Sequence, residues 1–212
     1  MGDYHVFSVT RIIDKRRQCG QVAIEGPSFS GIFRVEWPSR QYDPLPRQLV
    51  FCGREFPYLR FGFGRQWEWR ADLDAFTTEQ GTVVLTQGYE KSAVGRLPFC
   101  RSRYFFMNDP DLIYQDAELH HTGKTIYSIS GVDTRQLSID PLLGHVSLRT
   151  DGVTIRWQFS PRPVSGDIEQ APNECIFEFD QSRVEVVIMW SCEDAPRFPV
   201  FESITDAIAV GV

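Results

Sequence analysis

Apolar and polar residues alternate most strictly in the segment 145–159. The dipeptide Asp151-Gly152 interrupts it, and Asp-Gly is typical of two-residue type I′ turns, because both positions need a positive φ. A loop of that length pairs Thr150 with Val153 and fixes the register of both arms. The pattern therefore predicts an antiparallel hairpin with one face exposed to water, and His145 is expected to be a solvated histidine on that polar face. The opposite face is apolar and carries Val146, Leu148, Ile155, Trp157 and Phe159.

A second hairpin is predicted between Cys175 and Trp190, with its turn at Gln181-Ser182. Apolar residues alternate in both arms, which is typical of strands. The second arm differs from the first, because Val187 and Met189, which alternate with its other apolar residues, are also apolar. This arm is therefore expected to be buried on both faces, which requires another layer over it.

Shorter strand patterns cover much of the remaining chain. The longest runs from Gln66 to Phe76 and alternates with period two, as in a half-buried antiparallel strand. Glycine-containing turns separate the others at nearly regular intervals, which is typical of a sandwich or barrel. The other predicted strands are 6–13, 21–25, 31–37, 48–52, 82–87, 103–107 and 124–130.

Helix signals are few. Asp109-Pro110 resembles an N-cap followed by proline at the first helical position, which predicts a helix over 110–121. A capping-box pattern at Ser203 predicts a second short helix over 203–208. No linker divides the chain, and 160–172 is predicted to be a surface loop. The predicted fold class is therefore a single all-β domain spanning 1–212, an antiparallel β-sandwich or closed β-barrel with one or two short helices.

Composition narrows the class of protein. The chain has 212 residues, 42% hydrophobic, with a net charge of -6, which favours a folded protein over a disordered one. The acidic balance disfavours binding to duplex nucleic acid, which needs a basic face. Of the 22 basic residues only three are lysine, and arginine and aromatic residues are enriched at protein interfaces. Codon bias toward arginine would give the same ratio.

The N-terminal residues, the apolar runs and the cysteines indicate the cellular compartment in which the protein is expected. The first residues lack the apolar core of a signal peptide, and the longest apolar run, Val186 to Trp190, is far too short for a membrane span. The five cysteines are scattered without a C-x-x-C pair, as expected for reduced thiols. We therefore expect a cytoplasmic protein that does not insert into a membrane.

The segment from Phe56 to Trp69 is unusually rich in aromatic residues and arginine. Such a composition suits protein hot spots, a ring-lined ligand pocket or base stacking. A core strand with an arginine rim would have the same composition. If the segment is functional, the predicted binding residues are Tyr58, Arg60, Phe63, Arg65, Trp67 and Trp69.

The predicted metal ligands are Glu118, His120 and His121, since carboxylate and imidazole groups suit zinc, iron or manganese. On a helix, Glu118 and His121 would lie three residues apart on one side. Two histidines near a helix end, favoured by the dipole, would give the same pattern without a metal. Nucleophile and phosphate-binding motifs are absent from the sequence, so no catalytic residue is assigned and no cofactor is expected.

Three functions remain open on the sequence alone. The first is a non-catalytic protein–protein binding or assembly module, such as an inhibitor, an immunity-like protein or a structural subunit of a larger complex. The second is a β-barrel that binds a small apolar ligand in an aromatic-lined pocket. The third is a metal-dependent enzyme centred on Glu118, His120 and His121. A protein partner is expected, and the sequence does not define the oligomeric state.

Overall fold

The structure is a computed structural model. It describes residues 5–13, 18–36, 45–64, 69–78, 81–92, 95–108, 111–119, 124–150, 152–164, 168–194 and 196–201. Within these ranges the chain forms strands β1 to β17 in three antiparallel sheets, and the short 3-10 turn η1 (Thr134–Gln136) is its one helical element. No helix in this part of the chain is long and apolar enough to cross a membrane.

The five-stranded sheet contains the first strands of the chain in sequential order. Its last two strands meet in a two-residue turn at Cys52-Gly53, where both residues have positive φ angles of 49° and 74°. This is the type I′ geometry that suits a tight hairpin. The strands are β1 (His5–Ile13), β2 (Gln18–Glu25), β3 (Phe29–Glu36), β4 (Leu45–Phe51) and β5 (Arg54–Phe56).

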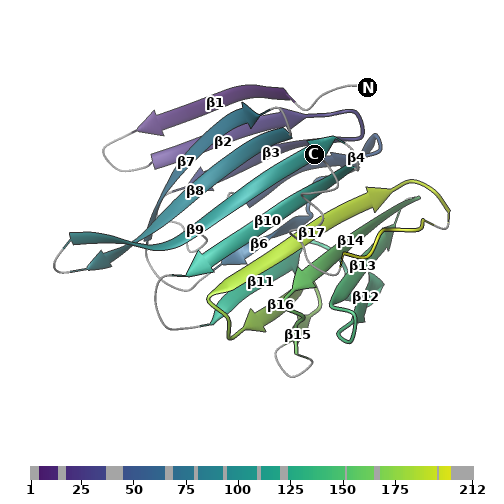
Figure 1. The fold of residues 1–212 in the computed structure, drawn as a ribbon. Coiled ribbons are helices and arrows are strands. Elements are labelled where there is room, and N and C mark those ends of the chain that lie inside the picture. The colour runs from purple at the N-terminus through teal and green to yellow at the C-terminus, as the bar shows by residue number, and fades with distance from the viewer. Residues whose placement is uncertain are drawn as a thin grey trace.

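The eight-stranded sheet has the order β12-β13-β14-β17-β10-β9-β8-β7. Figure 1 shows it crossing the molecule from β7 at the upper left to β12 at the lower right. Its strands are β7 (Trp69–Thr78), β8 (Gly81–Ser92), β9 (Gly95–Asn108), β10 (Asp111–Leu119), β12 (Leu137–Asp140), β13 (His145–Thr150), β14 (Val153–Ser160) and β17 (Arg183–Ser191).

The four-stranded sheet has the order β15-β16-β11-β6 and lies in the lower part of Figure 1. Its edge strand β6 lies close to β4 of the five-stranded sheet. Each of the three sheets ends in edge strands within the described ranges, so the sandwich-like alternative is correct and the closed barrel is wrong. The strands are β6 (Arg60–Gly64), β11 (Thr125–Ser130), β15 (Ile168–Ala171) and β16 (Glu174–Phe179).

One apolar core joins the three sheets. Phe29 of β3 packs its ring 5.8 Å from Phe106 of β9, between the five-stranded and eight-stranded sheets. Phe159 of β14 packs 4.9 Å from Phe177 of β16, between the four-stranded and eight-stranded sheets. Burial of such rings is the main favourable term in folding, at roughly 1.5–3 kcal/mol for each side chain. The aromatic residues are therefore chiefly core residues.

The register of the hairpin predicted at 145–159 is confirmed, but the wet face predicted for it is wrong, because His145, Thr154 and Gln158 on that face are buried. Strands β13 and β14 pair in the predicted register, with Thr150 opposite Val153 and His145 opposite Gln158. Gly152 has a φ of 74°. Local turn chemistry and alternation agree here, which is why the register could be predicted.

The helix predicted over 110–121 is wrong, because residues 111–119 form strand β10. This strand lies between β9 and β17 and is buried on both faces. Its polar residues resemble the exposed face of a helix, but they are paired in the structure. Gln115 accepts a hydrogen bond from the Tyr127 hydroxyl at 3.0 Å, and Asp116 binds Arg103. The second predicted helix, over 203–208, lies outside the described residues.

The second predicted hairpin is also wrong, although both of its strands exist. β16 pairs with β11 and β15, whereas β17 pairs with β10 and β14 in the opposite layer. The segment 180–182 therefore crosses from one sheet to another. Burial explains the difference, since β17 is apolar on both faces and occupies the interior of a covered sheet. The loop predicted at 160–172 includes the short edge strand β15.

Gly131 offers a test of the packing between loops. It has a φ of 80°, and a Cβ atom there would lie 1.7 Å from the carbonyl oxygen of Tyr58. Gly53 has a similar φ of 74° but nothing within 4 Å of its Cβ position. We expect Gly131→Ala to lower the free energy of unfolding by at least about 3 kcal/mol. Gly53→Ala should lower it by about 1 kcal/mol, the cost of the backbone conformation alone. Urea unfolding of both variants measures the difference, and equal effects would contradict this packing.

Candidate functional site

The eight-stranded sheet has a second, smaller apolar cluster on the face away from the core. Side chains alternate along β10, so that Ile113 joins the core while Leu112 and Tyr114 point to the outer face. Val187 and Met189 of β17 lie beside them, and all four are buried. Outer faces of antiparallel sheets are commonly polar, so this cluster needs a cover.

Residues 196–201, here called the strap, provide part of that cover. Phe198 and Phe201 pack against the outer cluster. Gln158 donates from Nε2 to the carbonyl oxygen of Phe201 at 2.6 Å and accepts from the Phe201 backbone at 3.5 Å. The Arg156 guanidinium lies 4.7 Å from the centre of the Phe198 ring, a cation–π contact. The strap is therefore held by β14 through both backbone and ring contacts.

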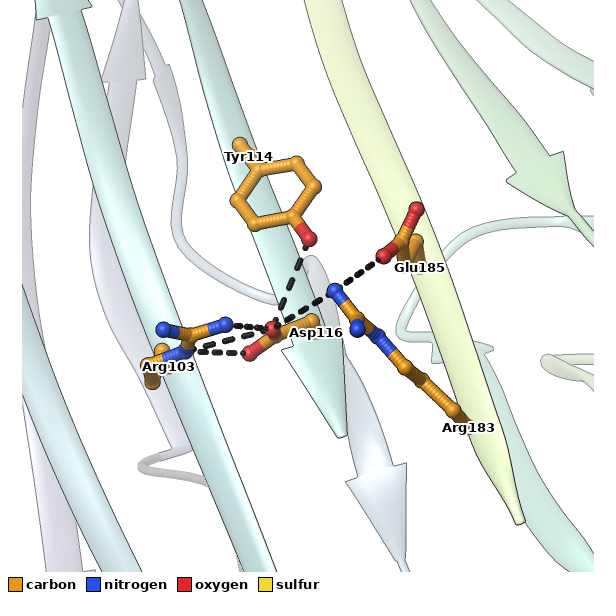
Figure 2. Close-up of polar contacts among 5 residues, drawn as sticks. All are labelled: Arg103, Tyr114, Asp116, Arg183 and Glu185. Atoms are coloured by element: carbon orange, nitrogen blue, oxygen red, sulfur yellow. Dashed lines mark hydrogen bonds and ion pairs between the residues drawn. The ribbon is translucent and has the colours of Figure 1, made fainter. Parts of the chain in front are cut away.

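A charged network lies on the same outer face (Figure 2). Arg103 of β9 donates from Nε to both carboxylate oxygens of Asp116, at 3.0 and 3.1 Å, and its Nη2 also contacts this carboxylate. The Tyr114 hydroxyl donates to Asp116 at 3.4 Å. Arg183 of β17 lies 4.0 Å from Asp116 and 2.6 Å from Glu185. Two arginines thus face two carboxylates across β9, β10 and β17.

The electrostatics of this network favour a structural role. Burial and the neighbouring carboxylate of Asp116 raise the pKa of Tyr114, so its hydroxyl stays protonated and can donate. The hydrogen bond to Asp116 raises the pKa of Arg103. Asp116 is only 4% exposed, and such a charge is tolerated only when it is paired. The network therefore links three neighbouring strands without offering an unpaired reactive group.

His145 lies on β13 near the strap and is buried. Its Nε2 has no hydrogen-bond partner among the described residues, and neither does Nε of Arg156. Burial and the positive charge of Arg156 lower the pKa of His145, with a smaller contribution in the same direction from Arg162. Asp140 and a hydrogen bond with Gln158 act in the opposite direction. The imidazole is therefore neutral in the folded protein at neutral pH.

Immediately before His145, the turn 141–144 presents apolar side chains to solvent. Leu142 is 80% exposed and Leu143 is 53% exposed, and Val164 in the adjoining loop is 64% exposed. We call Leu142, Leu143 and Val164 the apolar corner. Val200 of the strap is also exposed. Its neighbour Phe201 is hydrogen-bonded to Gln158, which lies opposite His145 on the adjacent strand. In the described part of the chain, Tyr58 is the remaining large hydrophobic residue that is this exposed.

Several hydrogen bonds hold the backbone of this turn. Oδ1 of Asp140 accepts hydrogen bonds from the backbone N–H groups of Leu142 and Leu143, both at 3.1 Å. Arg162 donates to the Leu142 carbonyl at 2.7 Å, and the Phe159 backbone donates to Gly144 at 2.9 Å. The φ of 67° at Gly144 is one that glycine adopts without cost. The leucines are thus exposed on a backbone that is fixed in advance.

The predicted binding residues lie in several environments. Tyr58 is 75% exposed, whereas the ring of Phe63 is fully buried and packs 5.0 Å from Tyr127. Arg60 is half-buried and donates to the backbone oxygen of Leu59, and burial lowers its pKa. Trp69 begins β7, with its side chain outside the description, and Arg65 and Trp67 lie outside the described residues. Of the predicted binding side chains that the structure describes, Tyr58 is the exposed one.

The predicted metal ligands are only partly visible. Glu118 lies on β10, half-buried, and contributes to the field around Arg103. His120 and His121 lie outside the described residues. Within the described ranges, no three His, Cys, Asp or Glu side chains come together in a way that could hold a metal ion.

The apolar corner is not among the binding residues that the sequence predicts. The signal is present in the segment Asp-Pro-Leu-Leu-Gly at 140–144, where turn-forming residues enclose two leucines. Turn positions are usually polar, so two apolar residues between aspartate–proline and glycine are unusual. Their exposure depends on the fold and could not be read from this segment alone.

Comparisons with known proteins give no family. No family model and no curated protein matches the chain. Among solved structures, it is similar to the crystal structure of 4-α-glucanotransferase from Thermococcus litoralis, at 9% sequence identity and a TM-score of 0.46. The match covers 86% of this chain and 39% of the other, so the chain spans about two fifths of that protein's length. A likeness at this level does not bear on function.

Asp116→Asn tests the charged network. The substitution leaves the partly exposed Arg103 guanidinium without its buried carboxylate partner, and we expect it to lower the free energy of unfolding by about 1–3 kcal/mol. Glu178→Gln is a suitable control, because its ion pair with Lys124 is largely exposed. This control should cost less than about 1 kcal/mol. Chemical denaturation compares the two, and a larger loss in the control would refute the role given to Asp116.

The buried imidazole predicts a pH dependence. Since the folded-state pKa of His145 is lowered from 6.5, the unfolded chain binds a proton first as the pH falls. The stability that the neutral imidazole contributes is therefore complete above pH 6.5 and is lost between 6.5 and the lowered folded-state pKa. Thermal unfolding between pH 7.5 and 5 should show this loss in the wild type. His145→Gln should reduce the slope, and an unchanged slope would argue against a neutral, buried His145.

Proposed function

We propose that this protein is a non-catalytic protein-binding or assembly module that contacts its partner through the apolar corner. The observation that supports the proposal is the exposure of Leu142 and Leu143 side by side on a hydrogen-bonded turn, with the exposed Val164 two residues after Arg162, which donates to that turn. Adjacent exposed apolar side chains such as Leu142 and Leu143 are a feature of interaction sites. Single exposed leucines are common on protein surfaces, so the support for a binding role comes from two adjacent exposed leucines.

The energetics favour association at this corner. Covering one leucine or valine side chain is worth roughly 1.5–3 kcal/mol, so three of them supply a useful part of a binding free energy. Binding also has an ordering cost, which is smaller when the contact residues are already fixed. The hydrogen bonds that Asp140 accepts and Arg162 donates hold the backbone of the turn before any partner arrives.

The surroundings of the corner suit a protein interface. Interfaces commonly have an apolar centre and a polar rim, with arginine enriched. Arg162 is exposed beside the turn and supplies a rim of that kind. The partner that fits is a folded protein with a shallow apolar pocket that accepts the two leucines. The proposed contact surface therefore differs from the segment Phe56–Trp69, where the described aromatic rings other than Tyr58 belong to the core.

A cytoplasmic location is part of the same proposal. Cys175 and Cys192 are free thiols, as expected in a reducing compartment. Burial raises the pKa of Cys175 to about 12, so this thiol stays protonated and unreactive.

Photo-crosslinking tests the proposal directly. A photoreactive amino acid at position 142 or 164 should crosslink, in extracts of the source cells, to one protein of defined mass. Tyr58 is the matched control, because it is as exposed and apolar but lies outside the corner. An excess of wild-type protein should compete for the crosslink, whereas the double variant Leu142→Asp, Leu143→Asp should compete at least about tenfold less well.

The outcome is interpretable only if the double variant is folded. Both leucines are exposed, so its thermal unfolding should match that of the wild type within a few degrees. A crosslink of equal strength at position 58, or full competition by the double variant, would show that the corner is not the contact surface.

A further inference from the structure

A second feature lies on the outer face of the five-stranded sheet, apart from the apolar corner. There, β2, β3, β4 and β5 form a concavity of about 620 Å³. This volume is within the range of small-molecule sites, roughly 300–1,000 Å³. The aliphatic lining includes Ala23, Ile32, Val50 and Pro57, and the polar lining includes Glu25, Ser30, Gln48 and Glu55.

The strand register places the polar groups at one end of this concavity. Glu25 pairs with Ser30, Ser30 with Val50, and Val50 with Glu55, so the four residues form one row across the sheet. The two glutamates are three strand spacings apart, about 14 Å between their Cα atoms. Their side chains share one face, and both are exposed. One carboxylate therefore lies at each end of the row.

The aliphatic surface lies next to that row. Ala23 pairs with Ile32 in the neighbouring row, so an apolar floor adjoins the acidic end. Among the described residues, no basic side chain lines the concavity, although Arg47, which lies opposite Ile32 in the pairing of β3 and β4, is exposed beside it. An acidic end beside an apolar floor is complementary to a molecule with one positive group and an apolar body.

The backbone around the concavity departs from regular strand geometry, and such a departure costs conformational free energy. The pairing of β3 and β4 shifts between Ser30 and Ile32, which marks a β-bulge. Gln48 lies within this bulge on β4 and has a φ of 49°, a left-handed conformation that costs a non-glycine residue about 1–2 kcal/mol. Bulges of this kind are over-represented next to functional sites, and backbone strain also gathers there.

Gly31 explains how the core continues beneath the concavity. A Cβ atom at this position would lie 2.9 Å from Leu49 and 2.9 Å from the Phe29 ring. The glycine therefore lets core side chains pack directly under the floor. The floor is supported by the core and is formed before any ligand binds.

From these observations we propose that the concavity binds a small organic cation, a primary amine or guanidine with an aliphatic body. The positive group lies between Glu25 and Glu55, and the aliphatic body lies on Ala23, Ile32 and Val50. The ligand is a free small molecule, since the concavity matches the size of one. This site does not rest on the proposed function at the apolar corner.

Calorimetry and NMR titration of the purified chain with hexylamine and hexylguanidine test the proposal, with 1-hexanol as the neutral analogue. We expect both cations to bind at least about tenfold more tightly than hexanol and to shift the amide signals of Ser30, Gly31 and Gln48. Binding should weaken as salt is raised. Equal binding of hexanol, or no binding of either cation, would overturn the proposal.

Glu25→Gln and Glu55→Gln should each weaken cation binding about fivefold, because each removes one carboxylate while keeping the size of the side chain. Glu169→Gln is the matched control, an exposed glutamate on the edge strand β15. Unchanged affinity in both pocket variants would contradict the assigned role of the two glutamates. A lysine tripeptide that bound while hexylamine did not would show that the occupant is a peptide, which would also refute a small-molecule site.

Discussion

Burial of the central strands β10 and β17 on both faces is the constraint on which the rest of the structure depends. One face of each strand joins the aromatic core shared by all three sheets. The other face carries Leu112, Tyr114, Val187 and Met189, which would be exposed on an uncovered sheet. Because exposure of this area is unfavourable, the outer face needs the strap, and the strap in turn places Gln158 and Arg156 in their contacts.

The same constraint determines which polar groups are paired. Asp116 is buried on the same outer face, and Arg103 and Arg183 from the adjacent strands compensate its charge. Gln115, on the opposite face, meets the Tyr127 hydroxyl from the four-stranded sheet. Buried polar groups of this kind favour one alignment of the strands over shifted ones, because a shift would leave them unpaired.

The sequence was informative where a feature is local. The 145–159 hairpin and most strands were predictable from alternation and turn residues, and two-sided burial of β17 followed from Val187 and Met189. Strand pairing was not predictable, because β16 and β17 are adjacent in sequence but belong to different sheets. The 111–119 segment resembled a helix because its polar residues are satisfied by distant partners. The apolar corner and the acidic concavity depend on assembled neighbours, so no single segment predicts them.

The two proposed sites occupy separate regions of the molecule, one on the turn between β12 and β13 and one on β2 to β5. The central claim about the fold is that the strap covers the outer apolar cluster of the eight-stranded sheet. Nuclear Overhauser contacts between the methyl groups of Val187 and Met189 and the rings of Phe198 and Phe201 test this claim most directly. The structure predicts strong contacts for both methyl-bearing residues. Absence of those contacts, together with broadening of the Val187 and Met189 methyl signals by a soluble paramagnetic agent, would contradict it.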